Sequence, residues 1–130
     1  MVKANNATRK LLILIVDDNM NFVERMISLL EEVRHIGYIN VASDFSEAYR
    51  YMSEEIPDLV LLDINLPGKS GIEILRRIRS EGHDSTVIML TNHHDEYYRQ
   101  LCRDLGANHF LDKSSDFNKV PAIIEEISAG

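Results

Sequence analysis

Residues able to do chemistry follow four hydrophobic runs of this chain. They are Asp17 and Asp18 after LLILIV, Asp63 after LVLL, Thr91 after VIML, and Lys113 after HFLD. If these positions meet, three ionised carboxylates repel one another unless a cation lies between them. A site of oxygen ligands with room for water suits Mg²⁺. The residue types therefore predict a magnesium site with a hydroxyl and an ammonium beside it.

Such a site suits phosphoryl transfer. A carboxylate can attack phosphorus as a nucleophile, while a metal ion and an ammonium offset the charge on the equatorial oxygens. Asp63 follows the run that is expected to form the central strand. It is therefore the best-placed nucleophile of the three carboxylates.

The hydrophobic pattern predicts the elements that position these residues. Apolar runs typical of strands alternate with segments in which apolar residues recur every three to four positions, as in amphipathic helices. We expect strands at 11–16, 38–42, 59–62, 86–90 and 108–111, and helices around 22–33, 45–52, 72–78, 97–105 and 123–127. Gly37, Gly82 and Gly106 follow helical runs, where a terminating glycine is expected, and Pro121 suits a first helical turn.

This alternation predicts an α/β fold. Strands that are apolar on both faces indicate a parallel sheet covered by helices on each side and linked by right-handed crossovers. The expected architecture is a doubly wound (βα)5 five-stranded sheet of the flavodoxin-like type, with strand order 2-1-3-4-5. Ligands of such sheets bind outside the carboxyl ends of the strands, which is where the reactive residues lie.

Each of these residues also has an ordinary structural interpretation. An aspartate after a strand is often the N-cap of the next helix. Lys113 alone would be read as a surface lysine, and Thr91 alone as a strand-end residue with a local hydrogen bond. Only the ordered combination, with one type of residue at each strand end, is specific.

That combination resembles the receiver domain family of bacterial two-component response regulators. The resemblance is carried by LILIVDDN, LVLLDINLPGKSG, VIMLTN and HFLDKS, and it extends over about residues 10–128. It implies that Asp63 accepts a phosphoryl group. It also implies that Mg²⁺ is held by Asp17, Asp18, Asp63 and the backbone carbonyl of Asn65.

The resemblance assigns three further roles. Thr91 would supply the hydroxyl that bonds the phosphoryl group, Lys113 its ion-pair partner, and Phe110 the aromatic residue that turns inward on phosphorylation. The surface expected to change is formed by the helix around 97–105, the strand at 108–111 and the helix around 123–127.

Two positions depart from the family pattern. Ser114 follows Lys113 where proline is commoner, which weakens the expectation of a cis peptide bond there. Asn92 follows Thr91 where a small residue is frequent. Because this position borders the acyl phosphate, the phosphoryl lifetime is left open.

The implied function is a phosphorylation-dependent signalling switch in the cytoplasm. The donor would be a sensor histidine kinase or a histidine phosphotransfer protein. The output would be a downstream effector protein or a fused output domain. Such a protein is not an enzyme toward other substrates, because it catalyses only its own phosphorylation and dephosphorylation.

Two other functions remain open from the sequence. A phosphohydrolase of the haloacid dehalogenase type shares the Asp nucleophile, Mg²⁺, Thr or Ser, and Lys, but its DxD motif follows the first strand, where this chain has Asp17-Asp18-Asn19. A degenerate receiver would act as an interaction module through its surface alone. Turnover of an external phosphomonoester distinguishes the first alternative.

Two weaker candidates lie between Thr91 and Gly106. The cluster His93, His94, Asp95 and Glu96 contains metal-ligand types, but adjacent histidines do not share the i, i+4 face that helical metal sites use. Apolar residues recur in the helical pattern that follows, including Tyr97, Tyr98, Leu101 and Leu105. A partner-binding face is one interpretation, but at helical spacing we expect the stripe to face the core, with room for one exposed tyrosine.

Composition limits the remaining classes. The chain has 130 residues, with one domain expected at 9–130 after a loose lead-in at 1–8. A net charge of −7 argues against direct nucleic-acid binding, and the first apolar run is too short for membrane insertion. The single cysteine, Cys102, excludes an intrachain disulfide.

Overall fold

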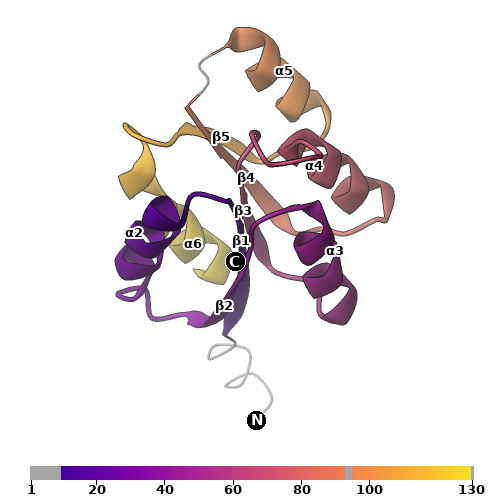
Figure 1. Cartoon of the computed structure of the whole chain (residues 1–130). Coiled ribbons are helices and arrows are strands. Elements are labelled where there is room, and N and C mark those ends of the chain that lie inside the picture. The colour runs from indigo at the N-terminus through magenta and orange to yellow at the C-terminus, as the bar shows by residue number, and fades with distance from the viewer. Residues whose placement is uncertain (1–9, 93–94, 130) are drawn as a thin grey trace.

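Strands and helices alternate along the chain (Figure 1). The computed structural model describes residues 10–92 and 95–129. In chain order the elements are β1 (Leu11–Val16), α2 (Met20–Leu30), β2 (Ile36–Ala42), α3 (Phe45–Glu54), β3 (Leu59–Leu62), α4 (Gly71–Ser80), β4 (Thr86–Thr91), α5 (Glu96–Asp104), β5 (His109–Asp112), the 3-10 helix η1 (Phe117–Lys119) and α6 (Val120–Ala129). The expected lead-in at 1–8 lies outside the described residues.

The five strands form one parallel sheet in the order β2-β1-β3-β4-β5. The predicted architecture and strand order are therefore confirmed. The central strand β3 pairs with β1 on one side and with β4 on the other. Residues that follow these three strands are consequently neighbours at one edge of the sheet.

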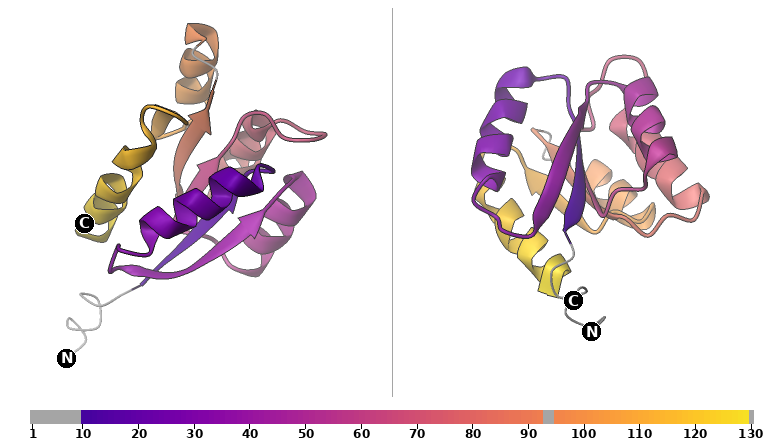
Figure 2. Two further views of the ribbon diagram at one scale, coloured as in Figure 1. Left: turned by 60° about the vertical axis from the view of Figure 1, so that its left-hand side comes forward. Right: turned by 90° about the horizontal axis from the view of Figure 1, so that it is seen from below.

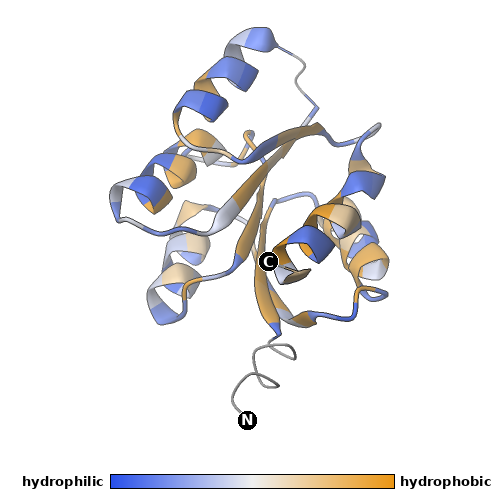
Figure 3. Ribbon diagram, turned by 180° about the vertical axis from the view of Figure 1, so that it is seen from behind, coloured by the Kyte–Doolittle hydropathy of each residue, from blue (hydrophilic) through white to orange (hydrophobic). Residues whose placement is uncertain are grey.

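Helices cover both faces of the sheet (Figure 2). One hydrophobic core contains Ile13 and Ile15 of β1 together with residues of α2 and α6. The other contains Leu14 and Val16 together with residues of α3, α4 and α5. Alternate residues of a strand point to opposite faces of the sheet, so β1 contributes side chains to both cores. Figure 3 shows that the strands are largely apolar.

Residues other than the three reactive aspartates cap the helices beside the site. The side chain of Asn19 accepts a hydrogen bond from the backbone N–H of Phe22 at the start of α2. Ser70 accepts one from the N–H of Ile72 at the start of α4. The interpretation of Asp17, Asp18 or Asp63 as a helix cap is therefore wrong.

The expectation for Gly37 needs correction, and the stripe on α5 has one exposed tyrosine. Gly37 lies inside β2 instead of ending a helix, and a Cβ there would lie 2.8 Å from the Cβ of Lys10, so close approach of the chain explains the glycine. Tyr97 is 66% exposed, and Cys102 is the buried residue of α5. The stripe on α5 thus faces the core only in part. Gly82 and Gly106 follow helices with positive φ, as expected.

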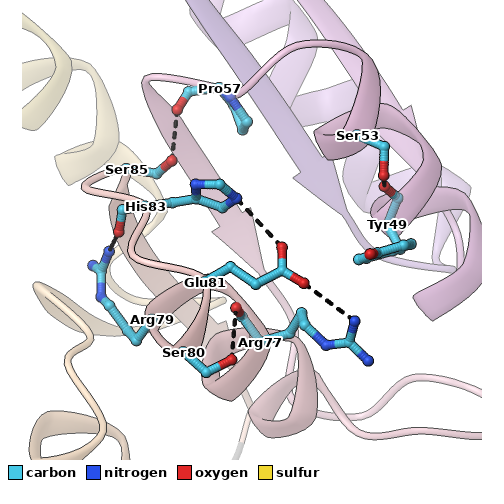
Figure 4. A network of polar contacts seen from close by, with 9 residues as sticks. All are labelled: Tyr49, Ser53, Pro57, Arg77, Arg79, Ser80, Glu81, His83 and Ser85. Atoms are coloured by element: carbon cyan, nitrogen blue, oxygen red, sulfur yellow. Dashed lines mark hydrogen bonds and ion pairs between the residues drawn. The ribbon is translucent and has the colours of Figure 1, made fainter.

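The end of α4 is tied to the start of β4 by polar contacts (Figure 4). Glu81 pairs with Arg77 at 3.2 Å and with His83 at 3.5 Å. The hydroxyl of Ser85 donates to the carbonyl of Pro57 at 2.6 Å, which links the segments that precede β3 and β4. These contacts fix the end of the sheet opposite the reactive residues. Within the described ranges, no helix is long and apolar enough to cross a membrane.

Candidate functional site

Two buried carboxylates end neighbouring strands. Asp17 follows β1 and is 2% exposed, and Asp63 follows β3 and is 7% exposed. The backbone N–H of Asp63 donates to the carbonyl of Val16 at 3.0 Å, and that of Asp17 donates to the carbonyl of Ala42 at 2.9 Å. The sheet hydrogen bonding thus continues one residue past each strand and fixes both aspartates.

Asp18 completes a cluster of three carboxylates. One oxygen from each of Asp17, Asp18 and Asp63 can be chosen so that all lie within 4.8 Å of one another. Asp18 is exposed, so the cluster opens to solvent on its side. A purely carboxylate donor set with access to water fits Mg²⁺ and does not suit a metal that prefers nitrogen or sulfur ligands.

Lys113 brings the positive charge of the site. Its Nζ lies 2.7 Å from Oδ2 of Asp17 and 3.5 Å from Oδ2 of Asp63, and the residue is 9% exposed. The predicted meeting of ammonium and carboxylates is therefore confirmed. The shorter of the two contacts is to Asp17, so the main ion-pair partner of the lysine is the carboxylate that follows β1.

The loop after β5 holds Lys113 in place without a cis peptide bond in the described residues. The N–H of Lys113 donates to the carbonyl of Thr91 at 3.0 Å. Oδ1 of Asp112 accepts hydrogen bonds from the N–H groups of Ser114 and Ser115 and from the Ser114 hydroxyl. Ser114 therefore takes part in an Asp-centred turn of the kind that aspartate side chains stabilise.

The environment of Asp63 favours its neutral form. Burial raises the pKa of Asp63, and the negative charge of Asp17 raises it further. The charge of Lys113 opposes this effect, as does a 3.3 Å hydrogen bond that the N–H of Asn65 donates to Oδ1 of Asp63. A cation near the three carboxylates would act in the same direction as Lys113.

Gly71 is a site residue that the sequence analysis missed. A Cβ at this position would lie 1.9 Å from the backbone oxygen of Asp63. The N–H of Gly71 donates to the carbonyl of Ile64 at 2.8 Å, so the start of α4 turns back tightly on the end of β3. Gly71 is the last residue of the LPGKSG segment, so the family resemblance pointed to it. The contact between Gly71 and the backbone of Asp63 could not be read from the sequence.

Thr91 and Phe110 lie on the adjacent strands β4 and β5. Thr91 is fully buried at the end of β4, where it is in register with Asp112. Phe110 is half-buried, and the guanidinium carbon of Arg99 lies 4.9 Å from its ring centroid. The structure thus places Thr91 next to Lys113, and Phe110 one strand away opposite Met89, with Arg99 of α5 over its ring.

An aromatic ring lies under the ammonium of Lys113. The Nζ atom is 4.5 Å from the ring centroid of Phe22 in α2. Phe22 packs edge to face against Phe117 of η1, with ring centroids 5.8 Å apart. From the sequence, Phe22 is only the first apolar residue of the helix expected around 22–33, because apolar spacing does not reveal a contact with a residue so distant in the chain.

Two described residues of the weaker metal-site candidate have structural roles in α5. Asp95 acts as the N-cap of α5, where its side chain accepts a hydrogen bond from the N–H of Tyr97. Glu96 forms an ion pair with Arg99 at 3.8 Å. His93 and His94 lie outside the described residues.

Curated proteins similar to this chain are transcriptional regulators of bacteria. The chain is 33% identical to the alkaline phosphatase synthesis transcriptional regulatory protein PhoP of Bacillus subtilis, over 88% of this chain and 47% of the relative. It is 36% identical to the transcriptional regulatory protein CpxR of Klebsiella pneumoniae, over 88% of this chain and 48% of the relative. The chain spans half or less of the length of these relatives.

Solved structures and a family match agree with this similarity. A two-component response regulator of the LuxR family from Aurantimonas is 33% identical, with a TM-score of 0.83 over 93% of this chain and 86% of that one. The phosphorylated cyanobacterial phytochrome response regulator RcpA is 28% identical, with a TM-score of 0.77 over 91% of each chain. Residues 13–125 match the response regulator receiver domain family. The chain therefore belongs to the response regulator receiver domains.

Proposed function

We propose that this chain is a phosphorylation switch whose acceptor is Asp63. The observation that carries the proposal is the position of the Lys113 ammonium at the carboxyl ends of the central strands. It lies 2.7 Å from Asp17 and 3.5 Å from Asp63. An ammonium between a nucleophilic carboxylate and a second acid can bind the oxygens of an incoming phosphoryl group.

The transfer step requires an ionised Asp63. An oxygen of that carboxylate forms a bond to phosphorus while the P–N bond to a donor histidine breaks, and the imidazole leaves with the electron pair. Lys113 offsets charge on the phosphoryl oxygens, and the sheet holds Asp63 in a fixed orientation. Asp17, Asp18, Asp63 and the Asn65 carbonyl would hold Mg²⁺, which when bound neutralises negative charge on the phosphoryl group.

The signal would leave the site through Thr91 and Phe110. A new dianionic group demands hydrogen-bond donors. Thr91 is buried, and its backbone carbonyl accepts a hydrogen bond from the N–H of Lys113, so the two residues are neighbours. Movement of Thr91 changes the space available to Phe110, and thus the surface of α5, β5 and α6. Identical positions of Thr91, Phe110 and α5 in structures with and without beryllofluoride would contradict this route.

The partners follow from the same chemistry. The phosphoryl donor would be a sensor histidine kinase or a histidine phosphotransfer protein, and the receiver of the signal a downstream effector or a fused output domain. EvgA of Escherichia coli, a similar protein, is described as a DNA-binding transcriptional activator, and this chain covers 36% of its length. The net charge of −7 supports the absence of direct nucleic-acid binding by this chain.

The alternatives fit the site less well. A haloacid dehalogenase-type mechanism would use the carboxylate after the first strand as nucleophile. In this chain that carboxylate, Asp17, is engaged by Lys113 at 2.7 Å and accepts the N–H of Asn19 at 2.9 Å. A module that acts only through its surface does not need a buried lysine between two buried carboxylates, an arrangement that is costly to desolvate.

Phosphorylation by a small donor tests the proposal. Incubation with acetyl phosphate and Mg²⁺ should add one phosphoryl group by intact mass, and hydroxylamine should remove it, because an acyl phosphate is the product. Asp63→Asn should gain none. Unchanged phosphorylation of Asp63→Asn would contradict the assignment, and steady turnover of an external phosphomonoester would favour the phosphohydrolase alternative.

A further inference from the structure

We propose that Phe22 is a positioning residue for the phosphoryl-transfer site, because the Lys113 ammonium packs against the face of its ring. The inference deepens the proposed function and rests on it. It adds a cation–π contact from α2 to a site otherwise built from the ends of β1, β3, β4 and β5.

The geometry gives the ammonium three neighbours. Nζ of Lys113 lies 2.7 Å from Asp17, 3.5 Å from Asp63 and 4.5 Å from the ring centroid of Phe22. Lys113 is 9% exposed and Phe22 is 5% exposed, so water screens the contact little. Cation–π attraction is strongest in such desolvated surroundings.

The ring itself is held from two directions. The backbone N–H of Phe22 donates to Oδ1 of the helix cap Asn19 at 3.1 Å, which fixes the first turn of α2. The ring meets Phe117 edge to face, with an angle of 74° between planes, and the guanidinium carbon of Arg25 lies 4.8 Å from the centroid of Phe117. The backbone of Phe22 is therefore tied to the helix cap, and its ring packs against a second ring.

A ring suits this position better than a hydrogen-bond acceptor. The ammonium lies closer to Asp17 than to Asp63, so it must shift toward Asp63 to pair with a phosphoryl group there. The attraction of an aromatic face for a cation is not directed along one hydrogen-bond vector, so the ammonium can shift laterally without losing it. A polar side chain would instead compete with the phosphoryl oxygens for the donors of Lys113.

Phe22 is also part of a hydrophobic core, so its two roles must be separated. Site-specific replacement of Phe22 by phenylalanines with one, two and three ring fluorines keeps the shape and weakens the negative face of the ring. With saturating Mg²⁺ and acetyl phosphate, the phosphorylation rate should fall stepwise with fluorination, by about tenfold over the series, because a weaker contact lowers the fraction of molecules in which Lys113 is held at the site. That factor corresponds to about 1.4 kcal/mol, within the range of a buried cation–π contact.

A variant pair supplies a second readout. NMR of protein with labelled lysine should show the ε-methylene protons of Lys113 shifted upfield by the ring in wild type and in Phe22→Tyr, and unshifted in Phe22→Leu. Met26→Ala is the matched control, because it removes a fully buried side chain of the same core and the same helix and leaves both rings and Lys113 unchanged. It should lower stability by a similar amount while preserving both the shift and the phosphorylation rate.

The outcomes separate this inference from the proposed function. If wild type accepts no phosphoryl group, the proposed function fails, whereas the NMR shift still tests the contact. If wild type is phosphorylated and the rate is constant across the fluorinated series, Phe22 is only a core residue and the inference is overturned. A ring-current shift of Lys113 that persists in Phe22→Leu would also overturn it.

Discussion

The ammonium of Lys113 lies 2.7 Å from the carboxylate of Asp17, although the two residues come from opposite ends of the chain. Both are buried, so neither charge is well solvated without the other. In this state the ion pair neutralises one acid of the site, and Asp63 keeps a second, longer contact with the same lysine. The lysine therefore has a structural role before any phosphoryl group arrives.

Replacement of Lys113 by alanine should destabilise the fold and abolish efficient phosphorylation. Removal of one partner from a buried ion pair leaves an uncompensated charge and costs about 3–5 kcal/mol. Urea unfolding in metal-free buffer should show this loss, and Mg²⁺ should restore part of it. Lys119→Ala, at an exposed pair with Asp116, is the control and should change stability by less than about 1 kcal/mol. Equal stabilities of the two variants would contradict the account.

The raised pKa of Asp63 predicts how stability depends on pH without metal. Burial is its main cause, followed by the charge of Asp17. The folded state then binds more protons than the unfolded state above the ordinary aspartate pKa of 3.8, so stability decreases as pH rises through the folded pKa. Asp63→Asn should be more stable than wild type at neutral pH, and the difference should shrink toward about pH 4. A difference that grows as the pH falls would contradict the sign.

Asp18→Ala should remove metal binding while leaving the fold intact, because Asp18 is exposed. Calorimetric titration should show Mg²⁺ binding to wild type and none to the variant. Saturating Mg²⁺ should also raise the melting temperature of wild type alone, since a ligand bound only by the native state stabilises it by RT ln(1 + [L]/Kd). Glu24→Ala is the control, because Glu24 is an exposed acid on α2 that does not belong to the carboxylate cluster. A similar loss of binding in Glu24→Ala would point to a nonspecific charge effect.

Gly71→Ala should disturb the acceptor directly. The added Cβ would lie 1.9 Å from the backbone oxygen of Asp63, so the end of β3 or the start of α4 must move. We expect a loss of roughly 2 kcal/mol or more and a lower phosphorylation rate. Gly82→Ala is the control: its φ of 78° makes alanine unfavourable by about 1–2 kcal/mol, but the Cβ meets nothing within 4 Å. Only the first variant should slow phosphorylation.

The fold and the polar members of the site could be predicted because their signals are local. Apolar runs and helical spacing set the order of elements, and the topology then placed Asp17, Asp63, Thr91 and Lys113 at one edge of the sheet. The strand position of Gly37 was missed, because a glycine after a helical run does not reveal that another segment, here at Lys10, passes close to it. Helical spacing indicated that one tyrosine of α5 could be exposed, but not that it would be Tyr97.

The remaining features depend on tertiary contacts. Gly71 matters because α4 returns against Asp63, and Phe22 because α2 passes under the loop after β5. The pairing preference of Lys113 for Asp17 depends on distances that residue types do not determine. Such contacts between distant segments become visible only once the chain is folded.

The position of the phosphoryl group on the chain decides whether Asp63 is the acceptor. Wild type phosphorylated with acetyl phosphate and Mg²⁺ is reduced with borohydride, which converts an aspartyl phosphate to homoserine, and the product is mapped by peptide mass spectrometry. We expect homoserine at Asp63 and at no other aspartate. Homoserine at Asp17 or Asp18, or its absence from a protein that carries one phosphoryl group, would contradict it.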